Sequence, residues 1–357
     1  MTLELHERWT PDLRDELRGL LDEVAVDSSD HPPGGEHDPA WLDALRDGMG
    51  HRPLGLVHRN AGGIDGYLPL AWVRSRLFGR FLVSLPYLNR AGVVARSPDA
   101  ASELIDHADR LAQEGRAHYL ELRHEAGGVE HRKLNETRDE KSRMLLDLPD
   151  NGEALWKQLP SKVRNQVRKG ERFDLQLQWG GRELAPAFHS VFAIVMRDLG
   201  TPVYPRRFFE AIAHHLEGRA EFAVVWHEGQ PIAGALLVHD DLGGRGVTAV
   251  PSAACLRAAN PLNANMWMYH RLLERAIERG SDRFDFGRSS EGSGTWKFKK
   301  QWGAMPVPSA WQYARLRGET DAVRPDNPRY RRKIELWRRM PVWATRVAGP
   351  AIVRGIP

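Results

Sequence analysis

The feature of this chain that most constrains its fold is a repeat in the order of its predicted elements. Residues 56–68 and residues 224–236 align without a gap, and the alignment places Gly66 on Gly234. Apolar residues that alternate on both sides of a turn predict a β-hairpin in each stretch. Each hairpin is followed by a predicted strand, a long helix and another strand. We therefore expect two copies of one α+β unit, and chance similarity between two hairpins is the alternative.

The length of the chain and one cluster of turn residues suggest where the copies meet. A chain of 357 residues is long for one compact core, so two domains are expected. Proline, aspartate, asparagine and glycine gather at residues 148–152, which is typical of a linker. We predict an N-terminal domain over residues 1–150, a C-terminal domain with the active site over residues 151–320, and a tail over residues 321–357.

Composition and the absence of certain motifs exclude several classes of protein. Hydrophobic residues make up 41% of the chain and charged residues 27%, which is typical of a globular protein. The sequence lacks the pattern of a signal peptide and an apolar run of about 18 residues, so we expect a cytoplasmic protein. Cys255 is the only cysteine, which excludes an intrachain disulfide, and there is no His-Glu-x-x-His motif. We predict no metal site.

The positive charge of the chain is concentrated in its tail. The formal net charge is +4, yet residues 321–357 contain nine basic residues and three acidic ones. Tyr330, Ile334 and Trp337 are spaced to share one face of a helix among these arginines. Such a helix docks on the body of the protein, or it lies on an anionic membrane or on RNA. Docking is the default expectation, and peripheral contact with the inner face of a membrane is kept as an alternative.

Residues 284–303 combine features that a packed core does not need. The stretch opens as a strand in which aromatic residues flank Asp285, and it continues as a loop rich in glycine and serine that contains Arg288. Lysines and aromatic residues then alternate: Trp296, Lys297, Phe298, Lys299, Lys300 and Trp302. Cations beside rings in a poorly solvated place suit an anionic substrate. The alternative is a solvated basic face above core aromatics.

Two familiar catalytic motifs are incomplete in this stretch. Residues 287–292 have the glycine spacing of a Walker A loop, but Ser293 and Gly294 stand where lysine and serine or threonine are required. Residues 287–289 begin like the nucleophile elbow of a serine hydrolase, but the closing glycine is missing. We therefore expect neither a P-loop nor a serine nucleophile.

Two other segments carry arginines next to apolar residues. In residues 159–170, apolar residues recur every four positions, and Arg164 and Arg168 lie beside that stripe. A rank of arginines on a helix suits a partner that bears phosphates, although a solvated basic face is as common. In residues 200–207, two prolines make a rigid turn that presents further candidates for substrate binding: Tyr204, Arg206 and Arg207.

The repeated unit resembles the N-acetyltransferase (GNAT) fold in tandem, and three segments resemble a more specific family. Residues 159–170, 200–209 and 284–303 are similar to the FemAB family of peptidyltransferase-like proteins, in the branch associated with exosortase (PEP-CTERM) and exopolysaccharide systems. The resemblance covers residues 150–316 well and the N-terminal half in outline. It implies two tandem GNAT-like α+β domains, each with a mixed, mostly antiparallel sheet flanked by helices, and a basic helical tail.

The resemblance to FemAB proteins also implies an activity. Members of known activity use aminoacyl-tRNA to add amino acids to the peptide of a nucleotide- or lipid-linked peptidoglycan precursor. The resemblance therefore implies an N-acyltransferase that transfers an aminoacyl or related acyl group to an amine of an envelope or polysaccharide precursor. The Phe-Lys signature of the family falls on Phe298 and Lys299, which implies that Lys299 lies at the reaction centre. Asp285 is expected to orient this lysine or to accept a proton from the acceptor.

Two details concern the acceptor and the donor. Many FemAB relatives carry an aromatic residue where this chain has Ala-Val-Pro-Ser at residues 249–252, which leaves the acceptor open. An acetyl-CoA enzyme of this fold holds the pyrophosphate on a glycine-rich turn, but residues 251–261 contain no glycine. We therefore expect no bound cofactor and an activated donor such as aminoacyl-tRNA. The alternatives are an acyl-CoA-dependent N-acetyltransferase and a non-catalytic scaffold of a polysaccharide or protein-sorting system.

Overall fold

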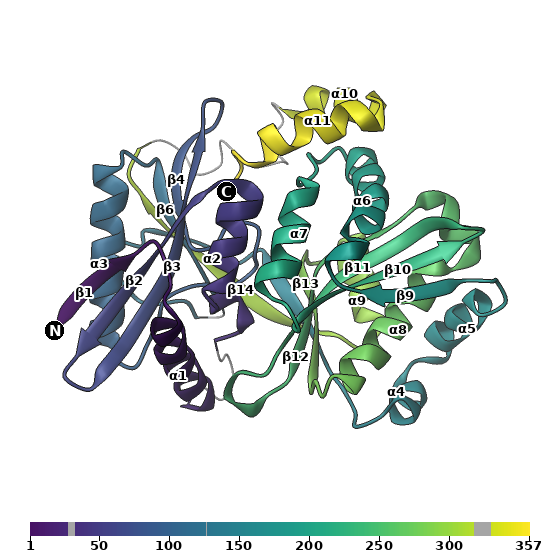
Figure 1. Cartoon of the computed structure of the whole chain (residues 1–357), viewed down its shortest axis with the longest axis horizontal. Coiled ribbons are helices and arrows are strands. Elements are labelled where there is room, and N and C mark those ends of the chain that lie inside the picture. Colours follow the sequence, from purple (N-terminus) through teal and green to yellow (C-terminus); the bar gives the residue numbers. More distant parts are fainter. Residues whose placement is uncertain (28–32, 126, 318–329) are drawn as a thin grey trace.

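The computed structural model describes residues 1–27, 33–125, 127–317 and 330–357, and two sets of its elements follow the same order (Figure 1). The first set consists of β1 (Thr2–His6), α1 (Pro11–Asp27), α2 (Ala40–Ala44), β2 (Arg52–Asn60), β3 (Gly63–Ser75), β4 (Gly79–Val83), β5 (Val94–Ala95), α3 (Pro98–Glu114) and β6 (Tyr119–Glu125). The second set consists of β9 (Gln176–Gly180), α6 (Ala185–Leu199), α7 (Arg206–His215), β10 (Ala220–His227), β11 (Gln230–Asp240), β12 (Val247–Cys255), α8 (Ala264–Glu278) and β13 (Arg283–Ser290).

Further elements lie between the two sets and after them. Those between them are β7 (Glu136–Arg138), β8 (Lys141–Asp147), α4 (Gly152–Gln158) and α5 (Ser161–Gly170). Those after them are α9 (Gly294–Lys300), β14 (Met305–Arg315), α10 (Arg331–Arg339) and α11 (Val342–Val353).

The strands join into one continuous sheet. Their order is β1-β2-β3-β4-β6-β14-β8-β13-β12-β11-β10-β9, while β5 pairs with β3 and β7 pairs with β14. Two pairs are parallel, β4 with β6 and β12 with β13, and the other described pairs are antiparallel. The parallel pair in each set is joined through a long helix, α3 or α8, as parallel strands require. The predicted class, α+β with a mixed and mostly antiparallel sheet, is confirmed.

Both predicted β-hairpins are present, but the alignment between them is displaced by one residue. β2 and β3 close on a two-residue turn, as do β10 and β11, and each hairpin carries a bulge after two residue pairs. Counted from the turns, Gly66 corresponds to Ala233, one residue before Gly234. The alignment of the sequence matched identical residues, whereas the register of a hairpin is set by its turn.

The two sets exchange a strand in the middle of the sheet. β8 follows the first set in the sequence, but it pairs with β13 of the second set. β14 follows the second set, but it pairs over residues 309–315 with β6 of the first set and over residues 305–308 with β8. Backbone hydrogen bonds therefore run without interruption from one copy to the other. The predicted domain boundaries remain a prediction.

Alternating side chains of each strand belong to different hydrophobic cores. In β10, Phe222 and Val224 join a core with α6 and α7, whereas Ala223 and Val225 join a core with α5 and α8. The core of α6 and α7 also contains side chains of α1 and α2, so helices of both copies share it. Figure 1 shows α2 and α7 near each other between the two halves of the sheet, with α3 on the outer side of the first half.

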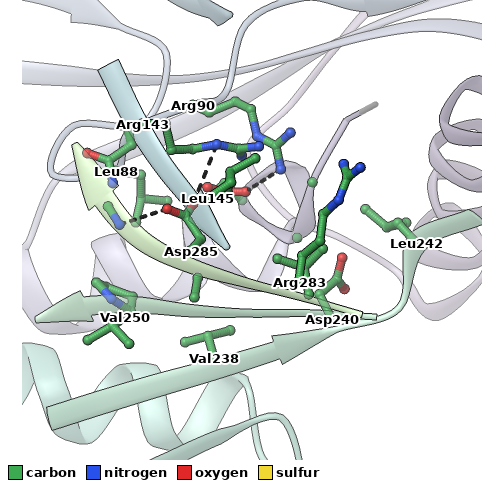
Figure 2. Close-up of a pocket in the computed structure, with 18 of the residues that line it drawn as sticks. Leu88, Arg90, Arg143, Leu145, Val238, Asp240, Leu242, Val250, Arg283 and Asp285 are labelled. Atoms are coloured by element: carbon green, nitrogen blue, oxygen red, sulfur yellow. Dashed lines mark hydrogen bonds and ion pairs between the residues drawn. The ribbon is translucent and has the colours of Figure 1, made fainter. Parts of the chain in front are cut away.

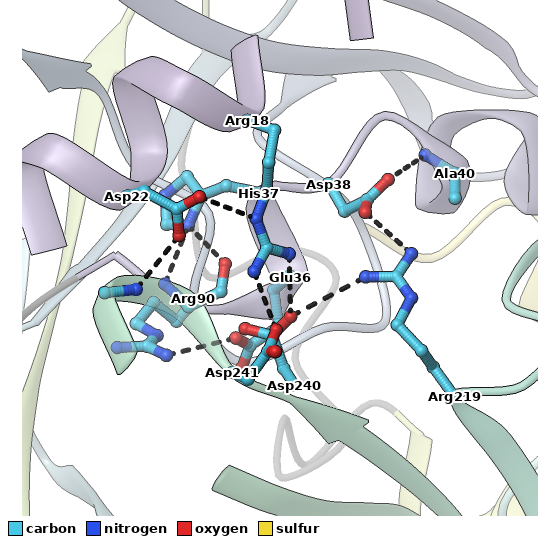
Figure 3. Close-up of polar contacts among 12 residues, drawn as sticks. Arg18, Asp22, Glu36, His37, Asp38, Ala40, Arg90, Arg219, Asp240 and Asp241 are labelled. Carbon is cyan, nitrogen blue, oxygen red and sulfur yellow. Dashed lines mark hydrogen bonds and ion pairs between the residues drawn. The ribbon is translucent and has the colours of Figure 1, made fainter. Parts of the chain in front are cut away.

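A polar cluster ties the first copy to the end of β11 in the second (Figure 3). Arg18 of α1 donates a hydrogen bond to Asp241 at 2.7 Å. Arg219 donates to Asp38 at 2.6 Å and lies 3.6 Å from Asp240. Burial raises the pKa of Asp240, and the two arginines oppose that shift. The cluster therefore fixes how α1 sits against the second copy.

The C-terminal tail docks on the body, as expected by default. Trp337 of α10 is 9% exposed, and Arg338 donates a hydrogen bond to the carbonyl oxygen of Leu199 at 3.1 Å. At the end of α11, the carbonyl oxygen of Val353 accepts a hydrogen bond from the Tyr87 hydroxyl at 3.2 Å. Figure 1 shows α10 and α11 lying above α6. The predicted start of the tail at residue 321 lies outside the described residues.

The docking of the tail is testable with two tryptophans that differ in burial. Trp337→Ala should lower the free energy of unfolding by about 3 kcal/mol, because a large buried side chain is removed. Trp343 is 71% exposed, so Trp343→Ala should change the same quantity by less than about 0.5 kcal/mol. Urea unfolding followed by circular dichroism measures both. Equal stabilities of the two variants would contradict the docked arrangement.

Candidate active site

Lys299 is held in a buried position on α9. The residue is 8% exposed, and its ammonium group donates hydrogen bonds to the carbonyl oxygens of Gly287 at 3.0 Å and of Arg288 at 3.1 Å. The hydroxyl of Ser293 accepts a hydrogen bond from the Trp296 amide at 3.2 Å, which caps the start of α9. An ammonium group has three hydrogens, and in the described residues two of them are in use. One donor of Lys299 therefore remains for a ligand.

Three polar groups converge on the space beside Gly287. This glycine has a φ of +75°, which disfavours a residue with a side chain. A Cβ built on Gly287 would lie 3.4 Å from Asn89 Nδ2, 3.8 Å from the Val250 carbonyl oxygen and 4.0 Å from Lys299 Nζ. Two hydrogen-bond donors and one acceptor thus face a point that the glycine leaves open.

The equivalent place in the first copy is filled. β4 runs parallel to β6 in the first copy as β12 runs parallel to β13 in the second. When the paired residues of the two copies are matched in order, Glu121 of β6 is equivalent to Asp285 of β13. By the same count, Arg123 is equivalent to Gly287. The Arg123 side chain is buried and donates a hydrogen bond to Glu121 at 2.7 Å. An arginine therefore occupies the first copy where the second copy has no side chain.

Asp285 supports the turn at Gly287. Its Oδ1 accepts a hydrogen bond from the Gly287 amide at 2.7 Å, and its Oδ2 lies 3.6 Å from Arg143 Nε (Figure 2). Burial raises the pKa of Asp285, although Arg143 and the Gly287 amide favour the charged form. Because both carboxylate oxygens face fixed partners, the geometry suits a group that positions the turn more than a group that shuttles protons.

A chain of alternating charges continues from Asp285 into the first copy. Arg143 Nη1 lies 3.0 Å from Glu125 Oε1, and Arg90 Nη1 lies 3.5 Å from Glu125 Oε2. Arg90 also donates a hydrogen bond to Glu36 at 3.2 Å. Arg90, Arg143, Asp285 and Gly287 line a cavity of about 90 Å³, which has room for a few water molecules or one small group of a substrate, but not for a whole substrate. These ion pairs fix the relative positions of the elements around Gly287.

A larger pocket, of about 490 Å³, lies between the loop after β4, the strands β13 and β14, and the C-terminal helices. Tyr204 and Arg288, both predicted to bind substrate, line it. Asn89 lines this pocket as well as the small cavity. Burial raises the pKa of Tyr204 to about 12, so its hydroxyl stays protonated. The volume is within the usual range of ligand pockets.

The other lysines of the central stretch do not join Lys299. Lys297 and Lys300 are exposed, and Lys300 Nζ lies 4.5 Å from the centroid of the Trp296 ring. Trp296 and Phe298 are partly buried against the core under α8. Residues 294–300 form a helix, so successive side chains point in different directions and the three lysines do not form one cationic cluster. No helix was predicted over these residues.

Arg164 and Arg168 lie on α5, which packs against α8, and neither residue lines either pocket. Figure 1 shows α5 at the opposite end of the molecule from α3. The valines of α5 are buried, as predicted. Arg168 is exposed and its guanidinium lies 5.3 Å from the centroid of the Trp156 ring. The structure thus presents Arg168 to solvent, and a role in phosphate binding remains a prediction.

The two arginines after Tyr204 serve contacts within the chain. Arg206 is exposed and lies 3.0 Å from Glu210, one helical turn further along α7. Arg207 donates a hydrogen bond to the carbonyl oxygen of Gly48 at 2.8 Å, which joins α7 to the first copy. The prediction that Arg206 and Arg207 bind substrate has no support from their positions, because neither lines the two pockets.

Two features at the start of α8 differ from a glycine-rich turn that binds a pyrophosphate. Residues 257–262 form a short 3-10 helix that contains Pro261, which has no amide hydrogen. The Asn265 amide, in the first turn of α8, donates a hydrogen bond to Cys255. Burial raises the pKa of this thiol to about 11, so it is not a nucleophile. In the first copy the start of α3 is capped by Ser97.

The described residues lack two further features. No helix among them is long and apolar enough to cross a membrane. No group of three or more His, Cys, Asp or Glu residues among them is arranged to hold a metal ion.

The burial of Lys299 predicts how the free energy of unfolding depends on pH. Burial lowers the pKa of Lys299 from 10.5 to about 8, although the charge of Asp285 opposes the shift. Between these values the unfolded chain binds a proton that the folded chain does not, so this group makes the fold more stable as pH rises. Relative to Lys299→Met, the wild type should gain about 3 kcal/mol between pH 7.5 and pH 10.5. Urea unfolding at several pH values measures the difference, and a constant difference would contradict the burial of this ammonium.

Comparisons with known proteins agree with an acyltransferase fold. Residues 158–300 match the family model described as an acetyltransferase (GNAT) domain. No curated protein matches the sequence of the chain. The crystal structure of FemX is 15% identical and has a TM-score of 0.64 over 87% of this chain and 97% of that one.

Two further solved structures share this arrangement. A tandem GNAT protein from the clavulanic acid biosynthesis pathway is 14% identical, with a TM-score of 0.52 over 87% of this chain and 97% of that one. L-PGS from Bacillus licheniformis is 14% identical, with a TM-score of 0.50 over 85% of this chain and 92% of that one. The chain therefore has the fold of tandem GNAT proteins, and its residues 158–300 match an acetyltransferase (GNAT) domain.

Proposed function

We propose that the chain is an N-acyltransferase of the FemAB type, which forms an amide by transferring an aminoacyl or related acyl group to an amine. The observation that carries this proposal is the convergence of Asn89 Nδ2 and Lys299 Nζ on the open space beside Gly287. Two donors that face one point suit the oxygen on which negative charge develops when an amine attacks an acyl ester. The open space lies in the copy that matches the acetyltransferase model.

In the proposed reaction the nitrogen of the acceptor attacks the carbonyl carbon of the donor ester. The carbonyl oxygen becomes negatively charged and accepts hydrogen bonds from Lys299 and Asn89, which stabilise the transition state more than the ground state. The intermediate then collapses, and the bond between the carbonyl carbon and the ester oxygen of the donor breaks. A proton passes from the nitrogen to this leaving oxygen, which becomes the free hydroxyl of the donor. Asp285 is a positioning residue in this scheme, because it holds the Gly287 amide at 2.7 Å.

An aminoacyl ester such as aminoacyl-tRNA is the donor that we favour. The start of α8 lacks a glycine-rich turn for a pyrophosphate, and Arg164 and Arg168 on α5 are our candidates for contacts with the phosphates of a tRNA. An acyl-CoA-dependent N-acetyltransferase is the second candidate, favoured by the match to an acetyltransferase (GNAT) domain. A non-catalytic scaffold is the third. Parallel incubation with charged tRNA and with acetyl-CoA separates the three.

For the acceptor we favour an amine on a precursor of the cell envelope or of an exopolysaccharide. This choice and the exosortase-associated branch rest on the resemblance of residues 159–170, 200–209 and 284–303 to FemAB proteins.

The outer side of the C-terminal helices supports a peripheral contact with an anionic membrane. Leu336, Trp343 and Val347 are 65%, 71% and 76% exposed, although they are large and apolar. Arg339 and Arg346 are exposed on the same two helices. We call these five residues the tail surface. Apolar side chains among arginines suit a membrane interface with anionic lipids, while the inner side of the same helices stays docked.

Removal of the Lys299 charge should abolish most of the activity. Lys299→Met keeps the length of the side chain and removes the ammonium donor, so turnover should fall by roughly 100-fold or more. Lys297→Met is the matched control, because Lys297 is exposed on the same helix and should retain near wild-type turnover. Transfer of a labelled amino acid from charged tRNA to a panel of amines measures the effect. Wild-type turnover of Lys299→Met would remove this lysine from the mechanism.

The tail surface makes a separate prediction about vesicles. The double variant Trp343→Ser/Val347→Ser should bind vesicles of phosphatidylcholine and phosphatidylglycerol at least about tenfold more weakly, because two apolar anchors are lost. Phe173→Ser is the control, since Phe173 is 39% exposed beside α5 and away from the tail. Cosedimentation measures the binding, and an unchanged affinity of the double variant would argue against membrane contact.

A further inference from the structure

The larger pocket contains a half-buried cation, Arg288, that the proposed reaction does not use. Arg288 lines this pocket, and its Cζ lies 3.3 Å from the centroid of the Trp311 ring. The Nε of Arg288 is buried and has no hydrogen-bond partner. Within the described residues, no carboxylate forms an ion pair with this guanidinium. An unpaired buried charge is unfavourable, so its retention needs an explanation.

A second arginine, Arg123, lies on the same ring, and its charge is paired within the protein. Arg123 Cζ lies 3.9 Å from the centroid of Trp311, and its guanidinium is bonded to Glu121 at 2.7 Å and to the carbonyl oxygen of Leu88 at 2.6 Å. Burial, together with the like charge of Arg123, lowers the pKa of Arg288 to about 9. Glu121 therefore neutralises Arg123, whereas no described carboxylate forms an ion pair with Arg288 on the same indole.

The indole itself is fixed. Trp311 Nε1 donates a hydrogen bond to the carbonyl oxygen of Asn89 at 3.0 Å. Arg288 therefore lines the pocket with its guanidinium held against a rigid ring, and a guanidinium in a fixed position suits the oxygens of a carboxylate or phosphate.

Much of the pocket wall is apolar, and its apolar residues come from segments far apart in the sequence. The turn between β3 and β4, the loop after β4 and the C-terminal helices contribute them: Leu77, Phe78, Leu88, Ile334, Trp337 and Ile352. Leu77 is 79% exposed, so this wall reaches the surface of the molecule. A ligand that fills the pocket needs an anionic group at Arg288 and an apolar part along these side chains.

We propose that this pocket binds an amphipathic anion, a phosphate or carboxylate joined to an apolar chain, with Arg288 as the residue that receives the anionic group. The C-terminal helices enclose the apolar chain through Ile334, Trp337 and Ile352. A small hydrophilic anion would leave the apolar walls unused, and a neutral apolar ligand would leave Arg288 unpaired.

The pocket adjoins the proposed reaction centre. The carbonyl oxygen of Arg288 accepts a hydrogen bond from Lys299 at 3.1 Å, and Asn89 lines the pocket. The amphipathic anion is therefore a substrate of the acyl transfer, an assignment that rests on the proposed function. Binding to the pocket does not require that function.

Isothermal titration calorimetry with the full chain tests the proposal, using alkyl phosphates and alkyl carboxylates below their micellar concentrations. Dodecyl phosphate, dodecanoate or both should bind with one site per chain, and inorganic phosphate should bind at least about tenfold more weakly. Octyl phosphate should bind about tenfold more tightly than hexyl phosphate, because two more methylene groups are buried. Arg288→Gln should weaken binding of the dodecyl ligand by tenfold or more, because a charged hydrogen bond is lost.

Two controls keep the test specific. Arg271→Gln removes an arginine that also lies over a tryptophan, 5.5 Å from the Trp267 ring, but that pairs with Glu274 on α8, and it should bind within twofold of the wild type. Ligand-free Arg288→Gln should melt at or above the wild-type temperature, since a buried unpaired charge is removed. Lys299→Met should keep binding, so loss of turnover and loss of binding are separated.

Three results would overturn the proposal. The first is equal affinity of Arg288→Gln and the wild type for dodecyl phosphate and dodecanoate. The second is inorganic phosphate binding as tightly as dodecyl phosphate, which would leave no role for the apolar walls. The third is a lower melting temperature of ligand-free Arg288→Gln with unchanged ligand affinity, which would make Arg288 a structural residue.

Discussion

Backbone hydrogen bonding of β14 to strands of both copies is the constraint on which the rest of the site depends. β14 pairs with β6 at one end and with β8 at the other, while β8 pairs with β13. This exchange brings Trp311 of β14 against Arg123 of β6 and Arg288 of β13. It also places Arg143 of β8 between Asp285 and Glu125, so that buried charges of both copies neutralise one another. The candidate site belongs to neither copy alone.

The two copies share an architecture but differ at one position that decides where a reaction fits. Glu121 and Asp285 are equivalent carboxylates beside equivalent parallel strand pairs. In the first copy Arg123 pairs with Glu121 and fills the place, whereas in the second copy Gly287 leaves it open to Asn89 and Lys299. A duplicated unit has thus kept one filled, structural centre and one open centre. The filled centre is also what holds Asn89, because Trp311 and Arg123 pack around the loop that carries it.

The sequence predicted what depends on local patterns. Alternation and turn residues located both hairpins, and the stretch around Asp285 and Lys299 was singled out because its glycines and lysines are adjacent in the chain. Asn89, Arg123 and Trp311 were missed, because they are single residues without a motif and meet only through the exchange of strands. The predicted cluster of three lysines was wrong in geometry, since α9 turns Lys297 and Lys300 to solvent. For Arg143, the signal that the sequence offers is a charged residue beside the apolar run of strand β8.

The central claim is that the charged form of Lys299 stabilises the oxyanion in the second copy. Its most direct test is the pH dependence of kcat/KM, measured with an acceptor amine that stays unprotonated throughout. Because burial lowers the pKa of Lys299 to about 8, kcat/KM of the wild type should fall as pH rises through about 8. In Lys299→Arg the fall should move above pH 10, since a guanidinium keeps its proton. A fall at the same pH in both proteins, or activity that rises through pH 8, would contradict the claim.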